Sequence, residues 1–460
     1  MNELSNSLFA SDMATTLHPY TNARLHEQVG PMIMTRGDGV FVYDSTGKEY
    51  IEGLAGLWSV AVGFSEKRLA DAAFKQMQEL PYYHTFAHKA TEPSIRLADK
   101  LVEMTPENLT RVFFTNSGSE ANDTVIKMLW YMNNGLGRPE KKKFLARNKG
   151  YHGITVASGS LTGLPGNHKD FDLPAIPVRH LTCPHYWRWA NEGESEAEFT
   201  ARLLQEAEDV ILEEGPETIA GFIGEPVMGA GGVMLPPKGY WPGIEALCRK
   251  YDIVLIADEV INGFGRTGEP FGCQAMGFTP DILVTSKQLT SSYMPLAAIV
   301  FSEAIYDAIA DNTNKLGGFG HGFTGSGHPV ACAVGLENLN IIEEKDLMGN
   351  AARLGPKFQE GLRRFADHPL VGEVRGVGLI AGIELVADKA SKRSFEPAGS
   401  VAAKAAKISH EEGLICRNVY ETLALCPPLI INEEQIDMIL ERMARVLDRT
   451  WDWVQAEGIS

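Results

Sequence analysis

The stretch IVLIAD at residues 253–258 and the stretch DILVTSK at residues 281–287 decide the fold class. Each is a short apolar run that ends in a charged side chain, Asp258 in the first and Lys287 in the second. Such runs, bounded by turn residues, are typical of strands buried in a parallel sheet. Ligands of open α/β sheets bind beyond the carboxyl ends of the strands. From these two residues alone, Asp258 and Lys287 are either ordinary solvated or capping residues, or they form a buried ion pair there or share a cofactor.

Helix-like and strand-like segments alternate from about residue 65 to residue 325, which predicts βαβ units and a mostly parallel sheet. The clearest strands are at residues 111–114, 220–223, 253–257 and 282–285. After residue 330 a long helical stretch leads to an apolar segment at 376–385, followed by more helix. We predict an α/β protein with an N-terminal segment (1–64) that joins a smaller C-terminal α+β domain (330–460), and a large cofactor-binding domain (65–329).

Composition narrows the class of protein. The 44% hydrophobic and 22% charged content is that of an ordinary globular protein, and the net charge of −17 argues against nucleic-acid binding. Six scattered cysteines without C-x-x-C spacing weaken the case for a zinc site or disulfides, so we expect reduced thiols and no metal. No apolar run approaches membrane-spanning length, and residues 1–16 lack a signal-peptide pattern. We expect a cytoplasmic protein that does not bind membranes.

Two glycine-containing stretches are candidate phosphate sites. TNSGSEAND at 115–123 follows a strand and opens a helix, so Ser117, Gly118 and Ser119 either cradle a phosphate or merely cap the helix. GHGFTG at 320–325 matches G-x-G-x-x-G, but no apolar strand precedes it, which argues against dinucleotide binding. We expect its Thr324 to donate a hydroxyl to a phosphate instead.

Two further loops are candidate ligand contacts. In KGYHG at 149–153, Tyr151 lies between glycines and either lies flat against a planar ligand or packs within its loop. GEPVMGAGG at 224–232 follows a strand and predicts either a tight loop at a site or an ordinary turn.

Together these segments resemble the class III (ω-type) aminotransferases. The motifs occur in the family's order and span nearly the whole chain: TNSGSEA (115–121), GYHG (150–153), GEP (224–226), DEV (258–260), GFGRTG (263–268), Lys287 and RGVGL (375–379). The resemblance implies the type I aminotransferase fold and pyridoxal 5′-phosphate as cofactor. It also implies a homodimer or larger assembly, because the family builds its sites at a dimer interface.

The resemblance also implies residue roles. Lys287 forms the Schiff base with the cofactor and then moves the proton, and Asp258 pairs with the protonated pyridine nitrogen, which keeps the ring an electron sink. Val260 and Tyr151 pack on opposite ring faces. Gly118 and Ser119 bind the phosphate together with Thr324 of the other subunit. The whole cofactor-binding set is Ser117, Gly118, Ser119, Tyr151, His152, Glu225, Asp258, Val260, Lys287 and Thr324.

Departures from the family pattern narrow the substrate. Relatives that use 2-oxoglutarate commonly carry a glutamate where this chain has Ala230, and the local sequence resembles the amine:pyruvate branch. Arg417 matches the family's substrate-carboxylate arginine, although it can also be an ordinary surface arginine. The remaining substrate positions are Leu57, Trp58, Phe86 and Tyr151, of which Leu57 and Phe86 have core packing as a bland alternative.

These features predict transfer of an amino group from a primary amine or ω-amino compound to pyruvate. A decarboxylase or aminomutase on the same fold stays open, as do putrescine, taurine or β-alanine as donors. A binding protein on this scaffold without turnover is a further alternative. A nicotinamide dehydrogenase has only the misplaced glycine motif in its favour.

Overall fold

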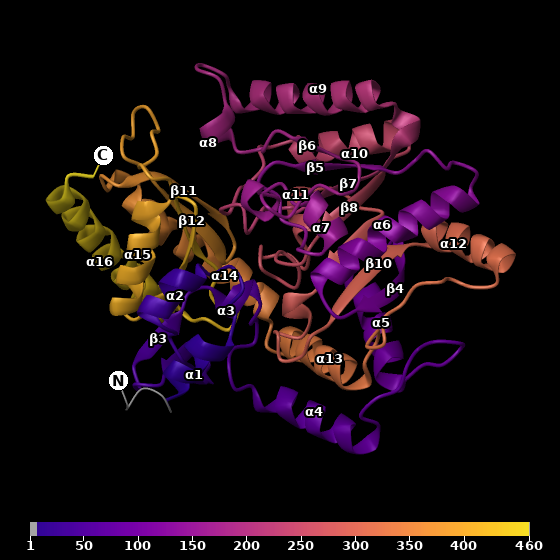
Figure 1. The fold of residues 1–460 in the computed structure, drawn as a ribbon, viewed down its shortest axis with the longest axis horizontal. Coiled ribbons are helices and arrows are strands. Elements are labelled where there is room, and N and C mark those ends of the chain that lie inside the picture. Colours follow the sequence, from indigo (N-terminus) through magenta and orange to yellow (C-terminus); the bar gives the residue numbers. More distant parts are fainter. Residues whose placement is uncertain (1–6, 460) are drawn as a thin grey trace.

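The centre of the molecule is a seven-stranded sheet, seen in the computed structural model, which describes residues 7–459 (Figure 1). Its strands, in order across the sheet, are β4 (Leu109–Thr115), β10 (Ala297–Ser302), β9 (Ile282–Thr285), β8 (Val254–Asp258), β7 (Ile219–Gly224), β5 (Lys143–Arg147) and β6 (Val178–Leu181). The five strands from β9 to β6 pair in parallel. The predicted mostly parallel sheet is therefore confirmed, and the four strands predicted from the sequence lie in β4, β7, β8 and β9.

One strand, β10, runs against its neighbours. It pairs antiparallel with both β4 and β9. The connection from β9 to β10, residues 286–296, contains only a short 3₁₀ helix, Lys287–Leu289. A parallel return needs a longer crossover, so this strand comes straight back along β9. Lys287 is therefore in a tight connection at the end of a buried strand.

Helices cover both faces of this sheet, which is why its strands are apolar along their whole length. In β8, Ile256 packs towards one helical layer, while Leu255 and Ala257 pack towards the other. The first layer consists of α6 (Gly118–Gly135), α7 (Val156–Leu161) and α12 (Glu303–Leu316). The second consists of α5 (Glu92–Met104), α9 (Glu196–Glu214), α10 (Tyr240–Lys250) and α13 (Pro329–Glu344).

The chain ends form a smaller region at the left of Figure 1. An antiparallel sheet there has the order β11 (Val371–Val377), β12 (Ile380–Leu385), β15 (Thr422–Leu425) and β14 (Arg417–Val419). A second sheet has the order β1 (Met34–Asp38), β2 (Phe41–Asp44), β3 (Glu49–Glu52) and β13 (Leu414–Ile415). Because β3 pairs in parallel with β13, N-terminal and C-terminal segments share one sheet. The boundaries after residues 64 and 329 remain our proposal.

The remaining helices connect or cover these sheets. They are α1 (Leu8–Thr15), α2 (Ala23–Val29), α3 (Ala55–Trp58), α4 (Lys67–Glu79), α8 (Tyr186–Trp189), α11 (Gly272–Met276), α14 (Leu347–Arg363), α15 (Ser400–Glu411) and α16 (Glu433–Glu457). Within residues 7–459, none of the helices combines the length and apolar character needed to cross a bilayer. The six cysteines are all buried and unpaired.

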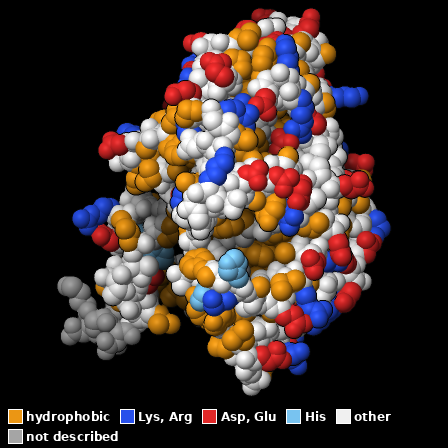
Figure 2. Space-filling model, turned by 90° about the vertical axis from the view of Figure 1, so that its right-hand side faces the viewer, with side chains coloured by type: hydrophobic (Ala, Val, Ile, Leu, Met, Phe, Trp, Pro, Cys, Tyr) orange, Lys and Arg blue, Asp and Glu red, His pale blue; other side chains and the backbone are white. Residues whose placement is uncertain are grey.

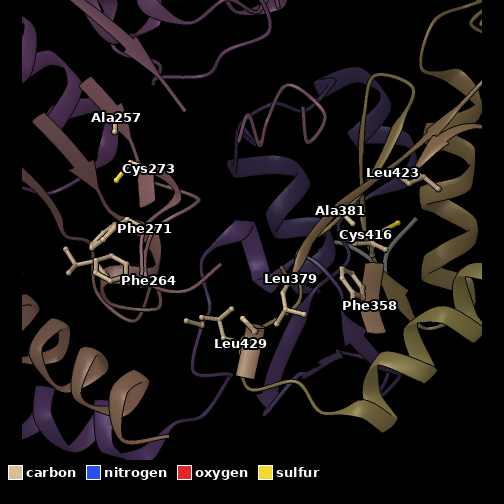
Figure 3. Close-up of a cluster of buried hydrophobic side chains, with 14 of the residues drawn as sticks. Ala257, Phe264, Phe271, Cys273, Phe358, Leu379, Ala381, Cys416, Leu423 and Leu429 are labelled. Carbon is tan, nitrogen blue, oxygen red and sulfur yellow. The ribbon is translucent and has the colours of Figure 1, made fainter. Parts of the chain in front are cut away.

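One hydrophobic core extends through both regions. Figure 3 shows Phe264 and Phe271 of the large region on one side, and Leu379 and Phe358 of the small region on the other. All four side chains are buried and belong to the same cluster. The two regions are therefore packed against each other, which fixes the small region over the carboxyl ends of β8 and β9.

Candidate active site

A cavity of about 130 Å³ lies where β8 and β9 end and α6 begins. Asp258 closes β8, and Lys287 follows the end of β9, so the two charged residues that decided the fold class meet here. Eight residues of the predicted cofactor-binding set line it: Gly118, Ser119, Tyr151, His152, Glu225, Asp258, Val260 and Lys287. Four residues that the sequence did not single out complete the lining: Asn122, Gly153, Ile261 and Ser286.

Lys287 is half-buried at the cavity and has a strained backbone. Its φ of +40° lies in the left-handed region, which residues other than glycine rarely adopt except where function demands it. Burial lowers the pKa of its amine, and the charge of Arg417 lowers it further, while Asp258 and Glu225 act in the opposite direction. A lysine in such surroundings favours the neutral amine, which is the nucleophilic form.

Asp258 is fixed by three donors. His152 Nδ1 lies 2.8 Å and Asn122 Nδ2 3.1 Å from Asp258 Oδ2, while the Val260 N–H donates to Oδ1 at 3.2 Å. Asn122 also donates to the carbonyl oxygen of His152 at 2.7 Å, so the three side chains form one unit. Asn122 follows Gly118 by one helical turn on α6, and this i, i+4 spacing is the signal that identifies it in the sequence.

The N-terminus of α6 opens into the same cavity. Ser117 caps the helix, because its hydroxyl oxygen accepts the Glu120 N–H at 3.2 Å. A Cβ on Gly118 would lie 3.2 Å from Val260 Cγ2, so glycine keeps this approach open. Ser119 Oγ accepts the Ile154 N–H at 3.2 Å. The backbone N–H groups of this first turn, together with the helix dipole, suit a phosphate.

Glu225 joins the two loops that flank the cavity. Its carboxylate accepts the N–H of Tyr151 at 3.0 Å and the N–H of Gly229 at 2.8 Å. Burial raises the pKa of this carboxyl, and the neighbouring His152 partly counters that rise. The side chain of Tyr151 is hydrogen-bonded to that of Tyr20 in the N-terminal segment. No sequence pattern indicated this contact.

These residues fit pyridoxal phosphate. A half-buried amine and a fixed carboxylate lie at one cavity, and a helix N-terminus supplies donors for an anion. His152 Nε2 and Asn122 Oδ1 are buried and have no hydrogen-bond partner among residues 7–459, as is expected of polar atoms beside a bound group. That Val260 and Tyr151 take opposite faces of the cofactor ring stays a prediction.

The predicted substrate residues differ in their solvent exposure. Trp58 is 1% exposed with a φ of +64°, and it packs in a cluster with Ile261, which lines the cavity. Leu57 is 55% exposed and Phe86 46%, so neither is a core residue of this chain. Ala230 is half-buried in the turn that follows Gly229.

Phe86 and Thr324 share an exposed patch away from the cavity. A Cβ on Gly322 would lie 2.7 Å from Phe86 Cε1, and the Tyr82 hydroxyl donates to the carbonyl oxygen of Thr324 at 3.0 Å. Figure 2 shows hydrophobic and histidine side chains together on the side of the molecule that lies to the right in Figure 1. Thr324 therefore does not line the cavity of its own chain, and its predicted role at the phosphate of another subunit stays a prediction.

Arg417 begins β14 and is half-buried. Its charge lowers the pKa of both Lys287 and Tyr151, which line the cavity, although Arg417 itself is not part of the lining. Within residues 7–459 no carboxylate pairs with it. A guanidinium in this position is available to a substrate.

Two groups of side chains lie close enough to hold a metal, but hydrogen bonds and ion pairs account for both. His18 Nε2 and His26 Nε2 each lie 2.9 Å from Asp12 Oδ2. In the second group, His185, Glu373 and Glu384, both glutamates pair with Arg375, at 2.7 and 2.5 Å. The expectation of no metal therefore stays a prediction.

Comparisons with known proteins agree with the site. Residues 22–447 match the family model for class III aminotransferases. A structure of the omega transaminase from Pseudomonas jessenii in complex with PMP has a TM-score of 0.97 and 58% identity, covering 98% of this chain and 99% of that one. A transaminase structure with L-alanine has a TM-score of 0.91 and 56% identity, covering 93% and 100%.

A curated relative, gamma aminobutyrate transaminase 1 (mitochondrial) of Solanum lycopersicum, is 48% identical over 94% of this chain and 84% of its own length. The matched family region contains the whole cavity, including Lys287 and Asp258. The chain therefore belongs to the class III aminotransferases and is a pyridoxal-phosphate-dependent enzyme that transfers amino groups.

Proposed function

We propose that this aminotransferase moves the amino group of an apolar primary amine, or of an ω-amino compound, to pyruvate and releases alanine. The observation that carries the proposal is the guanidinium of Arg417, which has no carboxylate partner within residues 7–459 and whose charge acts on Lys287. Ala230, rather than a carboxylate, stands five residues after Glu225. A free arginine can bind the carboxylate of pyruvate with paired hydrogen bonds. The related transaminase structure with L-alanine supports this class of substrate.

Lys287 and Asp258 each have a defined task in this reaction. When bound, the cofactor supplies a conjugated cation that takes up the electron pair left at the substrate carbon. Lys287, whose pKa is lowered by burial, removes a proton at its neutral Nζ and returns it in the reverse half-reaction. Asp258, fixed by His152 and Asn122, offers a negative charge of constant position to the cofactor ring.

We further propose that the working enzyme is a homodimer or a larger assembly. The patch that carries Phe86 and Thr324 is exposed in the single chain and lies outside its cavity. The adjoining helices α4 and α5 also expose apolar side chains, with Phe74 64% and Ile95 53% exposed. Burial of these side chains in an interface would be favourable. Light scattering of the purified protein is expected to give at least twice the 50.3 kDa chain mass, and a monomer would contradict the proposal.

We keep the cytoplasm as the proposed compartment. Six buried, unpaired cysteines support a reducing environment. The mitochondrial and chloroplastic compartments in the names of plant relatives belong to those proteins. Fluorescence microscopy of the tagged full-length chain in its own host tests this: diffuse cytosolic signal is expected, and signal confined to an organelle would refute it.

A second donor class is favoured by one observation. The plant relatives at 45–48% identity are named gamma-aminobutyrate transaminases. Arg417 could bind the carboxylate of such an ω-amino acid as well as that of pyruvate. The identity of the amine donor therefore has to be determined separately from that of the keto-acid acceptor.

The test measures alanine formed from pyruvate with 1-phenylethylamine, 4-aminobutyrate, β-alanine, taurine and putrescine as donors. We expect alanine with at least one donor and little glutamate when 2-oxoglutarate replaces pyruvate. Faster turnover with 2-oxoglutarate than with pyruvate would overturn the acceptor assignment. Released carbon dioxide or an isomerised amine would instead indicate a decarboxylase or an aminomutase.

A further inference from the structure

The hairpin that carries Arg417 is attached at its tip to the loop that carries Tyr151. Strands β14 and β15 pair from Arg417–Ala424 to Val419–Thr422, which leaves Tyr420 in the connecting turn. Lys149 Nζ lies 3.7 Å from the centroid of the Tyr420 ring. This is a cation–π contact of short range. The hairpin of the small region is thereby joined to the cofactor loop of the large region.

Both partners are held in costly backbone conformations. Lys149 has a φ of +69° and Tyr420 a φ of +51°, in the left-handed region that residues other than glycine rarely occupy. Such conformations persist where the surrounding structure requires them. The surrounding structure thus holds the backbone of both residues in an unfavourable conformation, and their side chains contact each other there.

Lys149 is also fixed relative to the Gly-rich loop at Ala230. A Cβ on Gly231 would lie 2.3 Å from the carbonyl oxygen of Lys149, so only glycine allows this approach. On its other side Lys149 precedes Gly150 and Tyr151, which lines the cavity. The lysine therefore lies at the junction of two loops that flank the site.

A second attachment holds the other side of the hairpin. Arg375 Nη2 donates to Thr422 Oγ1 at 2.9 Å and to the carbonyl oxygen of Gly232 at 2.6 Å. Arg375 is buried, whereas Tyr420 is 39% exposed and, with Lys149, lines a cavity of about 380 Å³. The contact between Lys149 and Tyr420 is therefore the attachment with room to open.

We propose that Lys149 and Tyr420 form a clasp that positions Arg417 and so determines the affinity for substrates that carry a carboxylate. This inference rests on the proposed function, because it assigns the clasp to the same arginine. Opening the clasp lets the hairpin tip move and reduces the fraction of molecules in which Arg417 is correctly placed. Neither clasp residue touches the reacting atoms, so both are positioning residues.

The test compares the loss of each partner with its conservative replacement. Lys149→Met and Tyr420→Leu are expected to raise the KM for pyruvate and alanine roughly 3- to 10-fold, with an unchanged KM for 1-phenylethylamine. Lys149→Arg and Tyr420→Phe keep a cation and a ring and are expected to stay near wild type. The double variant Lys149→Met/Tyr420→Leu should be no worse than the worse single variant.

Three kinetic results would overturn the clasp. The first is an effect of Lys149→Met without one of Tyr420→Leu, which would mean that the lysine merely attracts anions. Equal changes for amine and pyruvate, or additive effects in the double variant, would also contradict it.

Amide hydrogen exchange of the holoenzyme separates this failure from that of the proposed function. Exchange at residues 417–425 is expected to be faster in Lys149→Met and Tyr420→Leu than in their conservative counterparts, and unchanged exchange refutes the clasp. Arg417→Ala is measured in parallel. If it leaves the KM for pyruvate unchanged, the assignment of Arg417 fails, whatever the exchange rates show.

Discussion

Removal of the Arg417 guanidinium tests how the enzyme recognises its keto acid. In Arg417→Ala, no buried carboxylate loses a partner, because none within residues 7–459 pairs with this arginine. The fold should therefore be unaffected. A hydrogen bond to a charged group contributes about 1.5–3 kcal/mol, which corresponds to a rise of roughly 10- to 150-fold in the KM for pyruvate. An apolar amine, which has no carboxylate, should keep its KM.

The assay records initial rates of alanine formation over a matrix of pyruvate and 1-phenylethylamine concentrations. Arg417→Lys keeps the charge without the planar fork and should give an intermediate KM for pyruvate. Arg353→Ala, at an arginine that is 60% exposed and pairs with Asp346, is the matched control and should behave as wild type. Equal losses for amine and keto acid in Arg417→Ala would refute the reasoning.

Three further changes have defined outcomes. Trp58→Ala, at a side chain that is 1% exposed, should shift the preferred amine size and lower the unfolding free energy by roughly 3–5 kcal/mol; an unchanged amine profile would remove Trp58 from the site. Glu225→Ala leaves the Tyr151 and Gly229 N–H groups unpaired, at about 1–3 kcal/mol each, and should weaken cofactor binding in a fluorescence titration, whereas wild-type affinity would contradict its anchoring role. Burial lowers the pKa of Lys287 below 10.5, so that the unfolded apoenzyme binds more protons than the folded one. The free energy of unfolding of the apoenzyme should therefore rise with pH up to about 10.5. Denaturant titrations should show a smaller rise in Lys287→Met, and identical slopes in both proteins would contradict the pKa shift.

Much of the fold follows from local sequence. Strands β8 and β9 are buried on both faces, and such strands are continuous apolar runs that are visible without any alignment. The antiparallel direction of strand β10 could not be predicted from its own composition, because it depends on the short connection after Lys287. The pairing of β3 with β13 joins residues that are far apart in sequence, and no local pattern specifies it.

The candidate site could likewise be predicted from the sequence only in part. Asp258, Lys287 and the N-terminus of α6 sit at element ends, where chain position alone predicts their convergence. The i, i+4 spacing after Gly118 is the sequence signal for Asn122, whereas Tyr20 reaches the site through packing of the N-terminal segment, which only the folded chain shows. Phe86 and Thr324 lie outside the cavity of their own chain, and their contribution from a second copy is our proposal.

The most direct test of the account is the absorption spectrum of the holoenzyme, recorded before and after adding 1-phenylethylamine and then pyruvate. We predict a Schiff-base band that is absent in Lys287→Met, bleaches with the amine and returns with pyruvate as alanine forms. A band that persists with the amine but bleaches with alanine would keep the cofactor chemistry and overturn the proposed donor. Absence of the band in wild type supplied with pyridoxal phosphate would contradict the role of Lys287 itself.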